Sequence, residues 1–179
     1  ELFFPTACPF CGTLKERETV REKGCCPVCA GKYLHPAKRA VLAMPPFADS
    51  CIAAICCSYY GGPVRSAVRT FKFYEKNYLG AAFAGIFHQI LLESRLYPSV
   101  DLLVPVPISE ENLRLRGYNQ AGLIARELAL RSGLKMEEPL IRKIQGASQS
   151  SLLRSERISG AAARFAAVPA AGRSVKGRA

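Results

Sequence analysis

The chain has 179 residues, 49% of them hydrophobic, and a formal net charge of +11. This hydrophobic content supports a packed core and excludes a disordered chain. No apolar run approaches the ~18 residues of a membrane-spanning helix. The start lacks a secretory signal, so we expect a cytoplasmic protein. After Ile141, eight Lys and Arg residues face only Glu156. This excess favours a polyanion or a phosphorylated substrate as partner, although a solvated basic surface is the simpler alternative.

Two C-x-x-C pairs stand near the start, Cys8 with Cys11 and Cys26 with Cys29, separated by fourteen residues. This spacing is typical of a tetrahedral zinc site, and four protein thiolates leave no open position for catalysis. A module of ~30 residues has too little core to fold alone, so zinc would supply its folding energy. We therefore predict a small Cys₄ zinc-ribbon module with structural zinc over residues 1–40. A redox dithiol is less favoured, because two matched pairs are present.

The other cysteines do not fit this spacing. Cys25 adjoins a predicted ligand, but the pairing of Cys26 with Cys29 keeps the two-residue gap, so Cys25 is expected to be a bystander. Cys51, Cys56 and Cys57 lie in an apolar run and are expected to be small buried side chains.

The rest of the chain alternates strand and helix patterns. In order we expect a strand over 51–60, a helix around Val64 to Phe71, a helix from Gly80 to Arg95, a strand at Leu102–Val104, a helix with Leu123 to Leu130, a short strand at Leu140–Ile141, and a weak helix from Ser155 through Phe165. This order predicts an α/β domain with a largely parallel sheet over 41–179.

Aromatic and basic residues are interleaved around the first of these helices. The aromatics are Tyr59, Tyr60, Phe71, Phe73 and Tyr74, and the cations are Arg65, Arg69, Lys72 and Lys76. Such a set would stack and clamp single-stranded nucleic acid. The other interpretation is a core face beside a solvated face.

The most informative stretch runs from Asp101 to Gly133. A short apolar strand is stopped by Pro105 and Pro107, and a polar loop then leads to Arg116 and a helix. The carboxyl end of a strand and the amino end of a helix both face the crevice in which α/β proteins bind ligands. Helix N–H groups and a guanidinium favour an anion there.

The combined motifs resemble those of one family. They are the Cys₄ pairs, Tyr60-Gly61-Gly62, Val104-Pro105-Val106-Pro107 and Arg116-Gly117-Tyr118-Asn119-Gln120-Ala121. Together they resemble the ComF family of competence proteins, which are amidophosphoribosyltransferase-like with a double zinc ribbon in front. The resemblance covers nearly all of the chain. It implies a type I phosphoribosyltransferase-like parallel sheet, and a role in DNA uptake with single-stranded DNA and other uptake proteins, such as a helicase, as partners.

The resemblance also implies a site for the pyrophosphate of phosphoribosyl pyrophosphate, with Mg²⁺ only if that ligand binds. The residues that would line this site are Pro105, Pro107, Arg116, Gly117, Asn119, Gln120, Arg142, Gln149 and Arg157.

One departure from the family limits the expected activity. The D-D-x-x-T-T-G segment, which holds ribose and 5′-phosphate in this fold, is absent before Ala179. We therefore expect a fragment or an incomplete fold that is inactive as it stands, with an open sheet edge that would allow self-association. Two alternatives stay open: a non-enzymatic zinc-ribbon module that binds nucleic acid or protein, and a transferase that is active once the missing segment is supplied.

Overall fold

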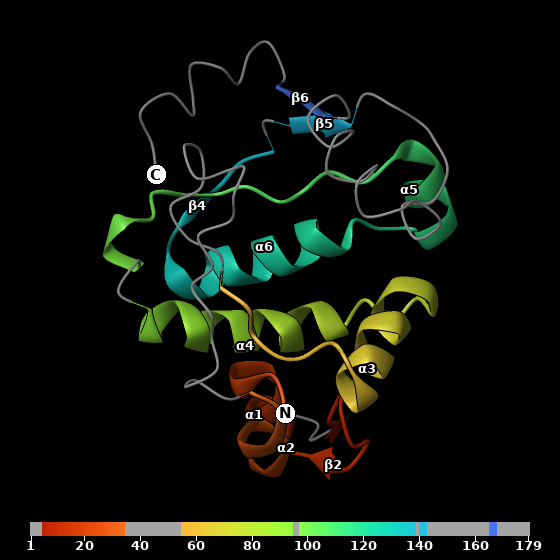
Figure 1. The fold of residues 1–179 in the computed structure, drawn as a ribbon, viewed down its shortest axis with the longest axis vertical. Helices are drawn as coiled ribbons and strands as arrows, with labels where there is room; N and C mark the ends of the chain where they lie inside the picture. Colours follow the sequence, from red (N-terminus) through yellow and green to blue (C-terminus); the bar gives the residue numbers. More distant parts are fainter. Residues whose placement is uncertain (1–4, 35–54, 95–96, 139, 143–164, 168–179) are drawn as a thin grey trace. The chain divides into compact units, whose positions relative to one another are not determined.

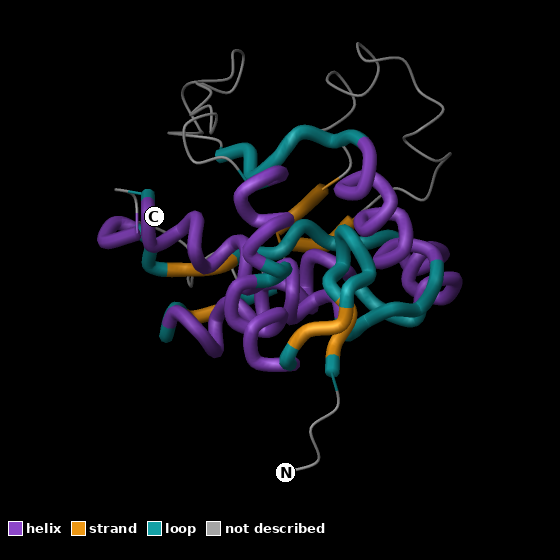
Figure 2. Tube along the Cα trace, turned by 90° about the horizontal axis from the view of Figure 1, so that it is seen from below, coloured by secondary structure: helices purple, strands orange, loops and turns teal. Residues whose placement is uncertain are grey.

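The computed structural model describes residues 5–34, 55–94, 97–138, 140–142 and 165–167. The chain divides into two compact units, Glu1–Arg95 and Leu96–Ala179 (Figure 1). Helices make up most of the described chain, and its strands are two or three residues long (Figure 2). They pair as β1–β2, β3–β4 and β5–β6. The described part is thus mixed α/β with small sheets, and it does not display an extended phosphoribosyltransferase-like sheet.

The first unit begins with a β-hairpin and continues as helices. Its elements are β1 (Thr6–Ala7), β2 (Leu14–Lys15), α1 (Arg17–Lys23), α2 (Pro27–Tyr33), α3 (Gly62–Phe73) and α4 (Leu79–Glu93). Pro27 starts α2 at a position where its missing N–H has no helical partner to lose. The core of this unit includes Val20 of α1, Phe71 of α3, and Phe83 and Ile86 of α4.

The end of α1 packs against α4 through two glycines (Figure 1). Gly24 ends α1 in the left-handed region at φ 79°, which glycine adopts without a steric penalty. A Cβ at Gly24 would meet the carbonyl oxygen of Ala82 and the side chain of Ile86. A Cβ at Gly85 would lie 2.7 Å from the carbonyl oxygen of Arg21. The two backbones therefore approach closely, and the segment with the four paired cysteines rests on α4.

The second unit contains a strand–helix–strand arrangement. Its elements are the 3₁₀ helix η2 (Tyr97–Ser99), β3 (Leu102–Leu103), α5 (Glu110–Arg116), α6 (Gln120–Ser132), β4 (Lys135–Met136), β5 (Leu140–Arg142) and β6 (Phe165–Ala167). β3 and β4 are parallel, with Leu102 opposite Lys135, and α5 and α6 form the crossover that a parallel pair requires. β5 and β6 are antiparallel.

Most predicted elements that fall on described residues are confirmed. These are α3, α4, β3, α6 and β5. The strand over 51–60 is wrong for its described part, in which Ile55 forms an isolated bridge and residues 56–60 are irregular. Phe165 was expected to end a helix and lies instead in β6. Three predictions fall outside the described residues. They are the domain boundary near residue 40 and the two site residues Gln149 and Arg157.

The structure also bears on membrane insertion. Within the described ranges, no helix combines the length and the apolar character needed to cross a bilayer.

Candidate metal centre and anion site

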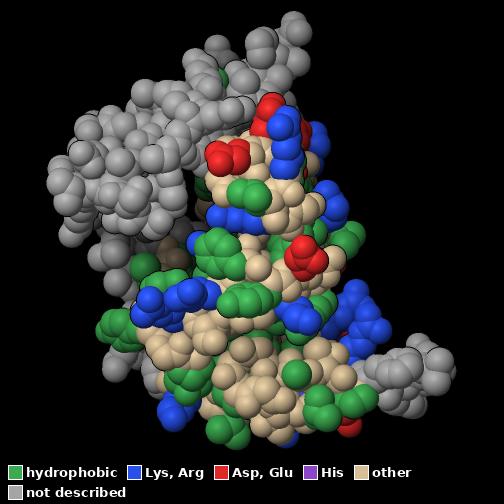
Figure 3. Space-filling view, turned by 90° about the vertical axis from the view of Figure 1, so that its right-hand side faces the viewer, with side chains coloured by type: hydrophobic (Ala, Val, Ile, Leu, Met, Phe, Trp, Pro, Cys, Tyr) green, Lys and Arg blue, Asp and Glu red, His purple; other side chains and the backbone are tan. Residues whose placement is uncertain are grey.

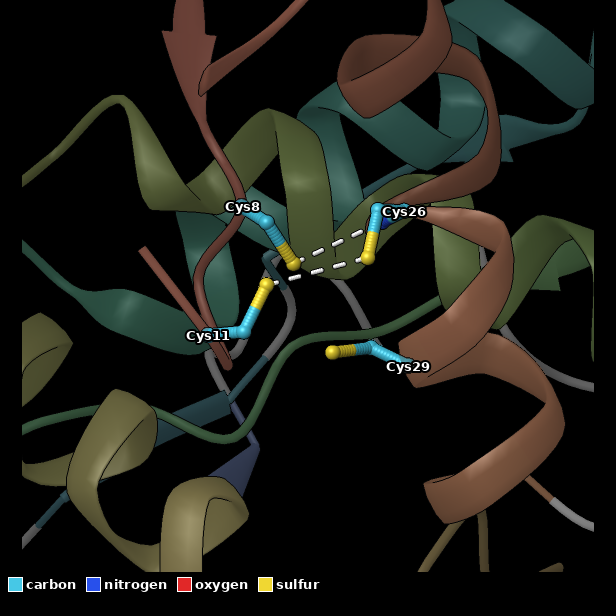
Figure 4. A group of neighbouring side chains, drawn as sticks. All are labelled: Cys8, Cys11, Cys26 and Cys29. Carbon is cyan, nitrogen blue, oxygen red and sulfur yellow. Dashed lines mark hydrogen bonds between the residues drawn. The ribbon is translucent and has the colours of Figure 1, made fainter. Parts of the chain in front are cut away.

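The four paired cysteines converge on one point (Figure 4). Cys8 and Cys11 come from the turn between β1 and β2, and Cys26 and Cys29 from the start of α2. Their sulfur atoms all lie within 4.8 Å of one another. A tetrahedral ion with metal–sulfur bonds of ~2.3 Å places its sulfurs ~3.8 Å apart. The observed separation of 3.7 Å between the Sγ atoms of Cys11 and Cys26 agrees with this geometry. The cluster can hold a metal ion.

Local hydrogen bonds shape each half of the cluster. In the hairpin turn the Gly12 N–H donates to the Cys8 carbonyl oxygen at 2.9 Å, and the Cys8 N–H donates to the Thr13 carbonyl oxygen at 2.9 Å. Gly12 has φ 73°, so glycine suits this turn. The Cys26 N–H donates to Cys8 Sγ at 3.4 Å and links the two halves (Figure 4). Such N–H···S contacts orient metal-binding sulfurs and disperse their negative charge.

The thiols differ in their readiness to ionise. Hydrogen bonds with Thr13 lower the pKa of Cys11 to about 6, because they stabilise the thiolate. Burial raises the pKa of Cys29, because desolvation and the neighbouring sulfurs disfavour a second charge. Four thiolates in such a small space repel one another, and a divalent cation offsets that repulsion. The arrangement therefore suits a bound cation.

Cys25 lies beside the cluster without joining it. It is fully buried at 0% exposure, and burial raises the pKa of its thiol to about 12. The expectation of a bystander is confirmed for Cys25, which is not one of the four convergent residues. The expectation of burial is wrong for Cys56, which is exposed, and Cys57 is half-buried. These two residues lie in the irregular part of the chain, where no regular element fixes an inward face.

The second candidate site forms where the loop after β3 meets α6. Asn119 is the N-cap of α6: its Oδ1 accepts a hydrogen bond from the Ala121 N–H at 3.1 Å. Its Nδ2 donates to the Val106 carbonyl oxygen at 3.2 Å, so the loop between Pro105 and Pro107 is tied to the start of α6. Pro105 is buried and Pro107 is half-buried. The structure thus joins the two segments that the sequence predicted to share a crevice.

Arg116 and Gln120 form the polar centre of this site. Gly117, at φ 75°, ends α5 and turns the chain so that Arg116 can donate to Gln120 Oε1 at 3.3 Å. Gln120 is only 9% exposed, and its Nε2 has no hydrogen-bond acceptor among the described residues. A buried amide without a partner costs ~1–3 kcal/mol. An acceptor bound there, such as a phosphate oxygen, would remove that cost.

The remaining predicted residues have different outcomes. Arg65, Arg69, Lys72 and Lys76 are all exposed on or just after α3. Arg142 lies in β5.

Sequence reasoning missed Thr13, although its place two residues after a predicted ligand was a usable signal. It also missed the contact of Gly85 with α1, which depends on packing between distant segments.

The chain was also compared with known proteins. No protein-family model, curated protein or solved structure matched it. The geometry of the residues themselves must therefore support any functional assignment.

Proposed function

We propose that this chain is a ComF-like protein of the phosphoribosyltransferase type, associated with DNA uptake, which binds single-stranded DNA and a phosphoribosyl pyrophosphate-like anion. The observation that supports the proposal is the buried Nε2 of Gln120, which has no acceptor among the described residues and is held beside Arg116 at the start of α6. A strand end, a helix start and a guanidinium together are the elements that bind phosphate groups in α/β proteins.

Each residue of the site has a separate role in this proposal. Arg116 supplies the positive charge and forked donors that pair with two phosphate oxygens. Gln120 Nε2 supplies a neutral donor. Asn119 makes no contact with the anion in this account, because both ends of its amide already hold the loop to the helix. These groups explain binding. They do not supply the acidic pair that would hold ribose, so we propose binding without turnover for the chain as it stands.

We further propose that the four-cysteine cluster holds zinc. Tetrahedral thiolate sites favour zinc or iron–sulfur chemistry, and four protein thiolates close the coordination sphere. Zinc would link the hairpin to α2. It would thereby fix the position of the end of α1, which packs on α4. The ion is structural in this proposal, because no coordination position is left for a substrate.

Calorimetry tests the anion site. Phosphoribosyl pyrophosphate with Mg²⁺ is titrated into the wild-type protein, Arg116→Ala and Gln120→Met. Loss of a charged hydrogen-bond donor should weaken binding at least about tenfold. Gln120→Met should also weaken binding. Its effect on stability should be small, because removing the buried Nε2 that has no acceptor offsets the loss of the hydrogen bond from Arg116 to Oε1.

Arg114→Ala is the matched control for the anion site. Arg114 is an exposed cation of the same helix, paired with Glu110 at 3.6 Å on the surface. Its removal changes the net charge by the same amount as Arg116→Ala and should leave the affinity unchanged. Equal losses in both variants would mean that the anion responds only to overall charge, which contradicts a built site.

A second candidate function is a non-enzymatic zinc-ribbon module that binds nucleic acid. The exposure of all four cations on or after α3 favours nucleic-acid binding and requires no transferase site. This alternative predicts that Cys8→Ser abolishes DNA binding, whereas Arg116→Ala does not, and that phosphoribosyl pyrophosphate gives no heat with any variant.

A further inference from the structure

Large aromatic side chains are exposed at both ends of α3. They are Tyr59, Tyr60, Phe73, Tyr74 and Tyr78, and their exposed fractions run from 52% to 77%. A single exposed aromatic needs no explanation, but five within twenty residues, at the two ends of one helix, exceed scattered exposure and indicate an interaction site. Tyr78 was not singled out in the sequence.

The core contacts of α3 fix which of its faces is exposed. Val64, Ala67 and Phe71 are buried and lie on one stripe of the helix. The Phe71 ring packs on the Phe83 ring of α4, with centroids 5.3 Å apart. Because Phe71 is anchored in the core, α3 cannot rotate its opposite face inward. Of the aromatics in this segment, Phe71 therefore belongs to the core, and the five others belong to the surface.

Cations line the exposed side of the same helix. Arg65, Arg69 and Lys72 follow at intervals of four and three residues, which places them on one face along ~10 Å of helix. Lys76 follows α3, and all four are exposed. Within the described ranges no salt bridge neutralises any of them. The segment from Gly62 to Tyr78 contains a single acid, Glu75. The side of the molecule on which α3 lies in Figure 1 shows Lys and Arg side chains beside exposed hydrophobic ones (Figure 3).

We infer that this α3 surface, made of the five exposed aromatics and the four cations, binds single-stranded nucleic acid by stacking bases on its rings while its cations contact phosphates. Charge complementarity selects a polyanion. The exposed rings favour a single-stranded polyanion, whose bases are free to stack on them, because bases in a duplex are already stacked on each other. An acidic protein segment would satisfy the cations and leave the rings without a matching surface. The inference rests on the proposed function only in taking single-stranded nucleic acid as a ligand of this chain.

Fluorescence anisotropy with labelled oligothymidine tests this surface on the full zinc-loaded chain. The single strand should bind more tightly than a duplex of equal length. Tyr59→Ala with Tyr60→Ala should weaken single-strand binding about tenfold or more and leave the salt dependence unchanged. Tyr59→Phe with Tyr60→Phe keeps the rings and should keep the affinity. Arg65→Gln with Arg69→Gln should reduce the slope of log K against log salt by about 1.4, since each phosphate contact contributes ~0.7 for a single strand.

Exposed residues of α6 provide matched controls. Leu130→Ala removes an exposed apolar side chain and Arg126→Gln an exposed cation, both outside the α3 surface, and neither should change binding. Equal affinity for duplex and single strand, full binding by the tyrosine-to-alanine variant, or displacement by polyglutamate as effective as by oligothymidine would each overturn the inference. Calorimetry with phosphoribosyl pyrophosphate separates the two proposals, because the α3 variants should retain its heat. Loss of phosphoribosyl pyrophosphate binding in Arg116→Ala would not bear on the inference for the α3 surface.

Discussion

Replacing Gly85 with alanine should loosen the contact between α1 and α4. A Cβ at Gly85 would lie 2.7 Å from the Arg21 carbonyl oxygen, 2.8 Å from the Glu22 carbonyl oxygen and 2.9 Å from the Gly24 nitrogen. All three neighbours are backbone atoms, so no side-chain rotation relieves the contact. In an open helix the substitution would stabilise by ~0.8–1 kcal/mol. Overpacking a close contact costs ~1–3 kcal/mol. The two ranges leave a net loss of ~0–2 kcal/mol, or about 1 kcal/mol at their midpoints.

Urea denaturation followed by far-ultraviolet circular dichroism measures this change. Gly122→Ala is the matched control, since Gly122 is also inside a helix and its added Cβ would meet only Asn119 side-chain atoms at 3.4–3.5 Å. The control should be neutral or more stable than the wild type. Gly85→Ala as stable as Gly122→Ala would refute the argument that the close approach of α1 and α4 requires glycine.

Three further predictions concern the cysteines and the cap of α6. Metal analysis should find one zinc per chain, lost in Cys8→Ser and retained in Cys56→Ser; retention in both would exclude Cys8 as a ligand. Mass spectrometry after iodoacetamide treatment at pH 8 should show Cys56 alkylated and Cys25 untouched, because burial raises the pKa of Cys25 to about 12. The folded protein favours the neutral form of the Cys25 thiol, so the contribution of Cys25 to stability should be complete below pH ~9 and decline as the pH rises toward 12. A Cys25→Ala protein that loses the same stability at alkaline pH would contradict this. Asn119→Ala should lower stability by ~1 kcal/mol through loss of the N-cap, whereas Asn77→Ala, at an exposed residue that precedes α4 without being its N-cap, should not.

The sequence was most informative where chemistry depends on short spacing. Cys8, Cys11, Cys26 and Cys29 come from two local turns, so their convergence could be predicted without knowledge of the wider fold. The cap at Asn119 and the turn at Gly117 are likewise local. The pairing of Arg116 with Gln120 spans only the short turn between α5 and α6, so it is local as well.

Features that depend on distant contacts could not be predicted in the same way. The fit of Gly24 against Gly85 joins segments sixty residues apart. The apolar run before Tyr59 favoured a strand, but its described part forms only a bridge at Ile55, and Cys56 is exposed as a result. Sequence pattern also could not separate core from surface among the aromatics near α3; the contact of Phe71 with α4 does so.

The most direct test of the central claim is calorimetry of phosphoribosyl pyrophosphate with Mg²⁺ on the wild type, Arg116→Ala and Arg114→Ala. The account predicts saturable binding by the wild type and Arg114→Ala, and a loss of at least about tenfold in Arg116→Ala. No heat from the wild-type protein, or equal binding by all three, would contradict the proposal that the start of α6 is an anion site.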